Sequence, residues 1–225
     1  MPPRGPALRQ LRVVDHGVRR GRAGGASRRR GGVTLDGVHV ERARAGRQRW
    51  RVPEADGTVR PVTLCMLAPA TVDEASAVAE MRDAAARWLL AKGIQQWRPG
   101  EVGPDAFVAR AEAGELFVVR VDGALAAAVV ITFAGPVVWG SDPGDAGYLH
   151  GLVIDRRRAA TGLGRAVLAE AEAHIWARDR GRARLDCVAA NRRLQAYYEA
   201  AGYHPVGKQT FDPGRGWHPA GMPPS

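Results

Sequence analysis

Length, composition and charge first limit what this chain can be. It has 225 residues, with 33 Lys and Arg against 23 Asp and Glu, a formal net charge of +10. That length suits one sizeable core, no apolar run approaches the ~20 residues that span a bilayer, and no apolar segment of a secretory signal follows the N-terminal arginines. Cys65 and Cys187 each lie in an apolar run, which favours reduced, buried thiols over a disulfide. We therefore expect a soluble cytoplasmic protein, monomeric or homodimeric.

The excess positive charge is confined to the first quarter of the chain. Residues 1–60 contain 15 arginines and 5 acidic residues, and the remaining residues are balanced. This region is rich in Arg, Gly, Ala and Pro, so we expect at least residues 1–31 to be disordered, with short strands possible at Val33–Val40 and Gln48–Val52. Two interpretations stay open: an arm that binds nucleic acid through phosphate contacts, or an over-extended start. No aromatic residue is interleaved among residues 1–31 to stack on bases, which favours the second.

From residue 61 to about 212 the pattern predicts one α/β domain, followed by a flexible tail at 213–225. A strand over Val62–Leu67 precedes a long helix from Thr71 to Ala91, where Thr71 and Glu74 form a capping box. A second helix is expected from Pro104 to Ala113. The strands Leu116–Val121 and Ala124–Phe133 are separated by Asp122-Gly123, a strong hairpin signal.

The stretch from Tyr148 to Val167 has the order of an anion-binding unit. An apolar strand, Tyr148–Ile154, is followed by three arginines at 156–158, a small-residue turn at 159–164 and an amphipathic helix that reaches Arg180-Gly181. The first N–H groups of such a helix are unpaired and lie at the positive end of its dipole. The turn lacks the Gly-Lys-Ser/Thr ending of a P-loop, and Val167 replaces the third glycine of a dinucleotide fingerprint.

The remaining elements carry a resemblance to a known family. A strand at Arg184–Val188, a helix from Asn191 to Ala201 closed by Gly202, and a final strand from Tyr203 follow in order. Together with the Gly162-Leu163-Gly164 turn, residues 61–210 resemble the GNAT superfamily of N-acetyltransferases, which use acetyl-coenzyme A. The resemblance implies an α/β (α+β) fold, with a central, mixed, mostly antiparallel sheet flanked by helices and a splayed central strand.

By the same resemblance, the cofactor lies along the central strand and the turn. The turn binds the pyrophosphate through backbone N–H groups, and the strand edge pairs with the pantetheine arm. Ala159 stands where the family usually has Gln or Arg, so Arg157, Arg158 or Arg165 is expected to replace that side-chain contact. The cofactor-binding residues are thus expected to be Leu152, Val153, Ile154, Arg157, Arg158, Ala159, Ala160, Thr161, Gly162, Leu163, Gly164, Arg165, Asn191 and Tyr198.

The resemblance also implies catalytic roles. Tyr198 matches the tyrosine that protonates the departing thiolate, although without the resemblance it reads as a core aromatic. His150 is a candidate base because an imidazole titrates near pH ~6.5. Glu115, Asp105, Asp186 or an ordered water are alternatives, and His150 also fits a histidine satisfied within the sheet. Cys187 is interpreted as a core residue rather than an acyl carrier, since no base is fixed beside it.

The acceptor is expected against the first helices and the following loop, at Gln96 and Trp97, with Trp139 across the opening. No metal site is predicted. The leading hypothesis is transfer of an acetyl group from acetyl-CoA to an unidentified primary amine by direct attack in a ternary complex. The alternatives are a nucleic-acid-binding protein that acts through its basic arm and a GNAT domain that binds acyl-CoA without catalysis.

Overall fold

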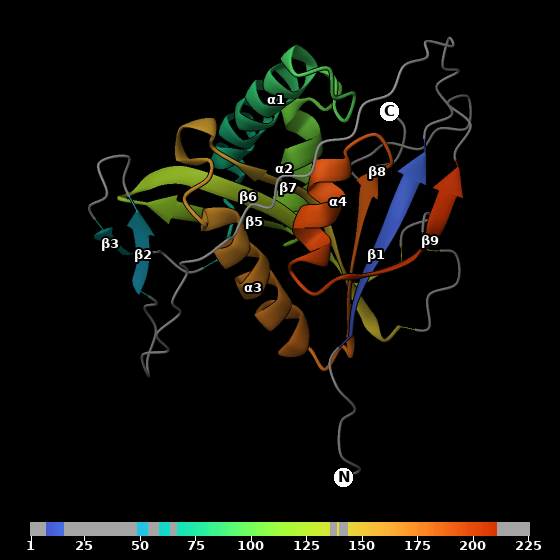
Figure 1. Ribbon diagram of the computed structural model, residues 1–225. Coiled ribbons are helices and arrows are strands. Elements are labelled where there is room, and N and C mark those ends of the chain that lie inside the picture. The colour runs from blue at the N-terminus through green and yellow to red at the C-terminus, as the bar shows by residue number, and fades with distance from the viewer. Residues whose placement is uncertain are drawn as a thin grey trace.

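A seven-stranded mixed sheet forms the centre of the molecule (Figure 1). The computed structural model describes residues 8–15, 49–53, 59–63, 67–135, 139 and 144–210. The sheet order is β4-β5-β6-β7-β8-β1-β9, and β2 and β3 form a separate antiparallel pair. The elements are β1 (Leu8–Asp15), β2 (Arg49–Pro53), β3 (Val59–Thr63), β4 (Ala68–Pro69), η1 (Val72–Glu74), α1 (Ala75–Ala91), α2 (Pro104–Glu112), β5 (Leu116–Val121), β6 (Ala124–Thr132), β7 (Ala146–Ile154), η3 (Arg156–Arg158), α3 (Leu163–Trp176), β8 (Arg182–Val188), α4 (Arg192–Glu199) and β9 (His204–Thr210).

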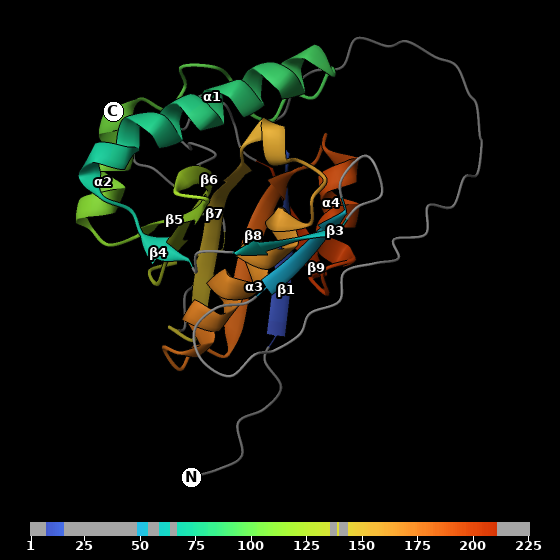
Figure 2. The ribbon, with the colours of Figure 1, turned by 90° about the vertical axis from the view of Figure 1, so that its left-hand side faces the viewer.

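Helices cover both faces of the sheet. Strands β4 to β7 pair antiparallel, whereas the β7–β8, β8–β1 and β1–β9 pairs are parallel. The α1 and α2 helices bury their apolar faces against β5, β6 and the end of β7, and α3 packs on the other face. Figure 2 shows β5, β6 and β7 lying between these two helical layers. The sheet thus has one core on each side, as the α/β prediction requires.

Local sequence signals explain most of the element boundaries. At the start of the first helix, the Glu74 carboxylate accepts from the Thr71 backbone N–H at 2.9 Å, as the capping box predicts. Asp122 and Gly123 both have positive φ, which a two-residue hairpin turn between β5 and β6 requires. The α3 helix ends at Trp176, earlier than predicted. Two turns with hydrogen bonds from residue i to residue i−3, followed by a left-handed Asp179, redirect the chain into β8.

The N-terminal region contributes a strand that the sequence did not predict. Residues Leu8–Asp15 form β1, which is paired on both edges between β8 and β9, and Leu11 is completely buried. Figure 1 shows this first strand between two of the last strands of the chain. The expected disorder of residues 1–31 is therefore wrong for β1, where four aliphatic residues lie within an arginine-rich composition. The strand expected at Gln48–Val52 corresponds to β2, whereas Val33–Val40 lies outside the described residues.

Strands β7 and β8 separate part-way along their length, which confirms the predicted splay. Their pairing runs from Ala146 opposite Arg182 to Leu149 opposite Leu185 and then stops. At the same place the register between β6 and β7 shifts, and Gly151 adopts a φ of +59°. This bulge reverses the side-chain alternation, so that Leu149 packs with the α3 core and Val153 with the α1 core. Beyond Leu149, no strand of the described residues pairs with β7 on its β8 side.

Candidate active site

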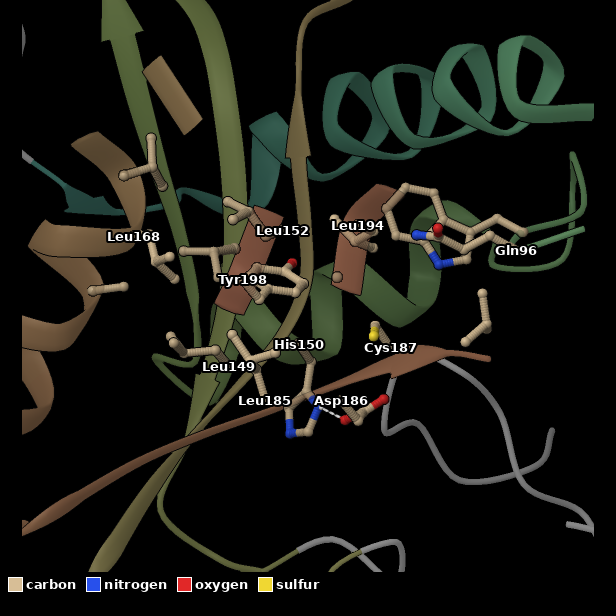
Figure 3. Close-up of a pocket in the computed structure, with 16 residues that line it drawn as sticks. Gln96, Leu149, His150, Leu152, Leu168, Leu185, Asp186, Cys187, Leu194 and Tyr198 are labelled. Carbon is tan, nitrogen blue, oxygen red and sulfur yellow. Dashed lines mark ion pairs between the residues drawn. The ribbon is translucent and has the colours of Figure 1, made fainter. Parts of the chain in front are cut away.

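A pocket opens where β7 and β8 separate, and Figure 3 shows its lining. The part lined by Val167, Leu168 and Ala171 of α3 is apolar and is called the donor end below. The part lined by His150, Asp186 and Gln96 is polar and is called the acceptor end. The lining consists of Gln96, Trp97, Val129, Leu149, His150, Gly151, Leu152, Val167, Leu168, Ala171, Leu185, Asp186, Cys187, Val188, Leu194 and Tyr198. Residues from three strands, two helices and the loop after α1 therefore meet at one splayed junction.

The turn before α3 has the backbone geometry of an anion cradle. Gly162 caps the helix with a φ of +82°, a conformation that favours glycine. The first backbone donors that return to the turn are Arg165 and Ala166, both to the Gly162 carbonyl, so the N–H groups of Leu163 and Gly164 precede the helical ladder. An added Cβ on Gly164 would lie 2.9 Å from the Tyr197 hydroxyl. That glycine thus allows close helix packing, whereas Gly162 makes the turn.

The arginines around the turn already have protein partners. Arg157 forms a forked ion pair with Asp155, with Nη2–Oδ2 at 2.7 Å, and this hydrogen bonding lowers the pKa of the carboxyl. Arg158 reaches a backbone carbonyl at the end of β5, and Arg165 one at the end of α4. Arg156 stacks on an α1 indole, that of Trp88, at 3.7 Å. None of the three arginines expected to replace the missing side-chain contact lines the pocket.

Tyr198 projects from α4 into the middle of the pocket (Figure 3). The residue is 7% exposed, and its ring packs edge-on against Tyr197 and Tyr203. Burial raises the pKa of the Tyr198 phenol, so the hydroxyl stays protonated across the physiological range. A neutral phenol in an apolar pocket is a proton donor, which is the state that the predicted acid needs.

His150 and Asp186 form a buried pair at the acceptor end. His150 Nδ1 lies 3.4 Å from Asp186 Oδ1, and the side chains are 3% and 9% exposed. Figure 3 shows the imidazole directed toward this carboxylate and away from the Tyr198 ring. Because Nδ1 faces the carboxylate, Nε2 is the ring nitrogen that can accept a proton. Among the alternative bases, Asp186 lines the pocket as the partner of His150, whereas Asp105 and Glu115 do not line it.

The loop after α1 closes the pocket from the side. Gln96 and Trp97, which were predicted to contact the acceptor, both line it. Gln96 Oε1 accepts from Asn191 Nδ2 at 2.6 Å, and the Asn191 carboxamide oxygen caps α4 by accepting from the Leu194 N–H at 3.0 Å. Asn191 therefore holds the loop and the helix together and does not line the pocket. Trp139 also lies outside the lining, packed against the ring of Tyr148 at 6.2 Å.

Cys187 lies in the pocket wall with the properties of a core residue. The thiol is free and buried, and burial raises its pKa to about 12. A thiol in that state is not a nucleophile at neutral pH. The prediction that Cys187 is not an acyl carrier agrees with this environment.

Some lining residues carry no recognisable signal in the sequence. Val167, Leu168 and Leu194 are ordinary apolar positions of amphipathic helices, and only the splay of the strands exposes them to a pocket. The pairing of His150 with Asp186 joins strands 36 residues apart, so no local pattern could reveal it. The 3.6-residue period marks the helical positions as buried but not as pocket-lining.

Comparison with known proteins assigns the family. The model of the acetyltransferase (GNAT) family matches residues 80–203. This chain belongs to the GNAT family of acetyltransferases. Among curated proteins it is 35% identical over 146 residues to the uncharacterized N-acetyltransferase YesJ of Bacillus subtilis, covering 62% of this chain and 81% of YesJ.

Solved structures of other GNAT proteins share the fold. An acetyltransferase of Listeria monocytogenes is 25% identical with a TM-score of 0.58, covering 66% of this chain and 90% of that one. The aminoglycoside N-acetyltransferase AAC(6')-Iy, solved in complex with CoA, is 19% identical with a TM-score of 0.50, covering 69% and 97%. No helix within the described ranges of this GNAT acetyltransferase is long and apolar enough to cross a membrane.

Proposed function

We propose that this GNAT protein transfers the acetyl group of acetyl-CoA to a primary amine by direct attack, with His150 as the base and Tyr198 as the acid. The observation that carries the proposal is the splayed β7–β8 junction, which has a neutral phenol on one side and a buried His–Asp pair on the other. The two ends of the pocket thereby separate the proton donor from the proton acceptor.

The chain offers matching groups for the donor. The Leu163 and Gly164 N–H groups, at the positive end of the α3 dipole, suit a pyrophosphate. The unpaired edge of β7 from Gly151 to Ile154 suits an amide-containing arm that adds as a strand would. Acetyl-CoA would supply an activated acyl carbon at this edge, where a backbone N–H of Leu152 or Val153 stabilises negative charge on the carbonyl oxygen. The CoA complex of the structurally similar aminoglycoside acetyltransferase supports this choice.

The proton balance follows from the two pocket ends. An alkyl ammonium has a pKa of ~10.4 and so keeps its proton at neutral pH. A base must therefore free the lone pair before attack. His150 Nε2 accepts that proton directly or through a water molecule, while the N–C bond forms and the C–S bond breaks. Tyr198 gives its proton to the departing thiolate. The phenol regains a proton from solvent, and the imidazole releases one.

Asp186 is assigned as a positioning residue. Its carboxylate faces Nδ1, so it holds the imidazole in the tautomer with Nε2 free and stabilises the imidazolium that forms. The 3.4 Å contact is longer than a well-formed hydrogen bond, as catalytic contacts often are before substrate binds. Asp186→Asn should therefore lower kcat while the melting temperature and the affinity for acetyl-CoA stay close to those of the wild type.

The test is thiol release from acetyl-CoA in the presence of a panel of primary amines, with the wild type and His150→Gln compared. His150→Gln keeps a buried polar side chain but lacks the base, so kcat should fall about 10²–10⁴-fold with unchanged acetyl-CoA affinity. If the wild type turns over none of the amines in a broad panel, the result would argue against the transferase. Equal turnover by His150→Gln would remove His150 from the mechanism and leave the transferase assignment in place.

A further inference from the structure

Two arginines lie against one tryptophan on the same face of the sheet as the His150–Asp186 pair, beyond that pair. The guanidinium carbon of Arg12 lies 4.8 Å from the centre of the Trp139 ring, and that of Arg184 lies 5.0 Å from it. The indole rests against Tyr148, whose ring centre is 6.2 Å away. These four residues are called the arginine–tryptophan cluster below.

The cluster continues the surface that carries the proposed base. Tyr148 and His150 are two residues apart on β7, as are Arg184 and Asp186 on β8, so each pair faces the same side of the sheet. Arg12 is opposite Asp186 in the parallel register between β1 and β8, which places it on that face too. Two residues of strand span roughly 7 Å. The cluster therefore lies within reach of a substrate whose amine is at His150.

The positive charges of the cluster have only neutral partners among the described residues. Arg184 donates from Nε to Gln10 Oε1 at 2.9 Å and from Nη1 to the Tyr148 hydroxyl at 3.0 Å. Within the described ranges, neither Arg12 nor Arg184 has a carboxylate at ion-pair distance. Two like charges that both lie about 5 Å from the centre of one indole repel each other, and a bound anion relieves that repulsion.

Two buried donors of the cluster also have no acceptor. Arg12 Nε and Trp139 Nε1 are shielded from solvent and make no hydrogen bond within the part of the chain that the structure describes. Trp139 is only 6% exposed, so bulk water does not serve as the hydrogen-bond partner of its indole N–H. Buried donors that stay unpaired are costly, and an oxyanion accepts from several at once. The cluster therefore has both the charge and the unpaired donors of an oxyanion site.

We propose that the arginine–tryptophan cluster binds a carboxylate or phosphate group of the acceptor, so that the substrate is a primary amine carrying an oxyanion several bonds from its nitrogen. Guanidinium groups recognise both anions through paired N–H donors. The position of the amine rests on the proposed function, whereas the anion site is testable without turnover. Arg12 comes from β1, outside the residues 80–203 that match the family. The N-terminal strand would thus give this GNAT protein its own acceptor preference.

The first test measures binding rather than catalysis. The whole protein, alone and saturated with CoA, is titrated calorimetrically with 6-aminohexanoate and with 6-amino-1-hexanol, which have the same amine and chain but differ in charge. We expect the carboxylate to bind at least about tenfold more tightly, with 3-aminopropyl phosphate as the phosphate counterpart. Equal affinities for the acid and the alcohol, or no binding of either oxyanion-bearing amine, would overturn the proposal.

A pair of variants locates the effect. Arg12→Gln should remove the preference for 6-aminohexanoate without changing the affinity for the alcohol. Arg9→Gln is the matched control, since Arg9 is on the same strand, three residues away, and forms an ion pair with Glu172 at 2.9 Å. A preference that survives in Arg12→Gln, or that is lost equally in Arg9→Gln, would exclude the cluster.

A second measurement covers the case in which Arg12→Gln does not fold. Inorganic phosphate should compete with 6-aminohexanoate and not with 6-amino-1-hexanol for the wild-type protein; competition with neither would overturn the anion site. The proposed function fails separately. If acetyl-CoA releases its thiol equally fast with the acid and with the alcohol as acceptor, only the anion site is excluded. If the oxyanion-bearing amines bind tightly but no thiol is released, only the transferase is excluded.

Discussion

The two ends of the pocket are built in different ways. The donor end comes from one continuous stretch, with the β7 edge, the glycine turn and the first turns of α3 following each other in sequence, and it offers mainly backbone groups. The acceptor end combines side chains from β7, β8 and the loop after α1, and the arginine–tryptophan cluster beyond it adds β1. A backbone-built end suits a ligand common to a family, and a side-chain-built end suits one that changes between its members.

The substitution with the largest expected effect is in β1, the strand that contributes Arg12 to the cluster beyond the acceptor end. Leu11 is fully buried between β8 and β9, so Leu11→Ala should lower the free energy of unfolding by about 2–5 kcal/mol. The control is Leu8→Ala on the same strand, where the residue is 43% exposed and the cost should be much smaller. Urea titration of both variants measures the difference. Equal and small effects would show that β1 does not belong to the folded sheet.

In the middle of the pocket, Tyr198→Phe keeps the aromatic ring and removes the hydroxyl proton. We expect kcat to fall about 10²-fold while the dissociation constant for acetyl-CoA stays within about twofold. Tyr203→Phe provides the comparison, since that ring packs 6.0 Å from Tyr198 but does not line the pocket. Steady-state kinetics combined with calorimetry separates the two parameters. A matching loss in both variants would mean that Tyr198 acts only through packing.

A smaller effect concerns the wall between the two ends. The Cys187 pKa is raised to about 12 by burial, so in the unfolded chain the thiol loses its proton from about pH 9 while the folded protein keeps it. The unfolded state then binds fewer protons, and stability falls as pH rises above about 9, by at most about 1.4 kcal/mol per pH unit. Cys187→Ala should flatten this slope between pH 8.5 and 10 in denaturant titrations. An unchanged slope would place the thiol in water.

The difference between the two ends also explains what the sequence could predict. The strand–turn–helix order from Tyr148 to Val167 is local, and the splayed strand expected from the resemblance is present. The His150–Asp186 pairing depends on a parallel register between β7 and β8 that no local pattern encodes. The arginine-rich composition led to a prediction of disorder that was wrong for β1. A strand needs only a few aliphatic residues at suitable positions, such as Leu11. The α3 end was misplaced because the pattern did not reveal the left-handed Asp179.

Calorimetric titration of the full chain with acetyl-CoA tests the central claim, that the α3 turn holds the donor. The matched variants are Thr161→Asp and Thr161→Asn, which have the same shape and both lose the Thr161 Oγ1 bond to the Arg158 carbonyl, 2.7 Å in the native turn. Only the aspartate places negative charge beside the α3 N-terminus, where it favours the helix but repels a phosphate. We predict wild-type binding, nearly unchanged in Thr161→Asn and at least about tenfold weaker in Thr161→Asp. No binding by the wild type, or equal affinities of the two variants, would contradict the account.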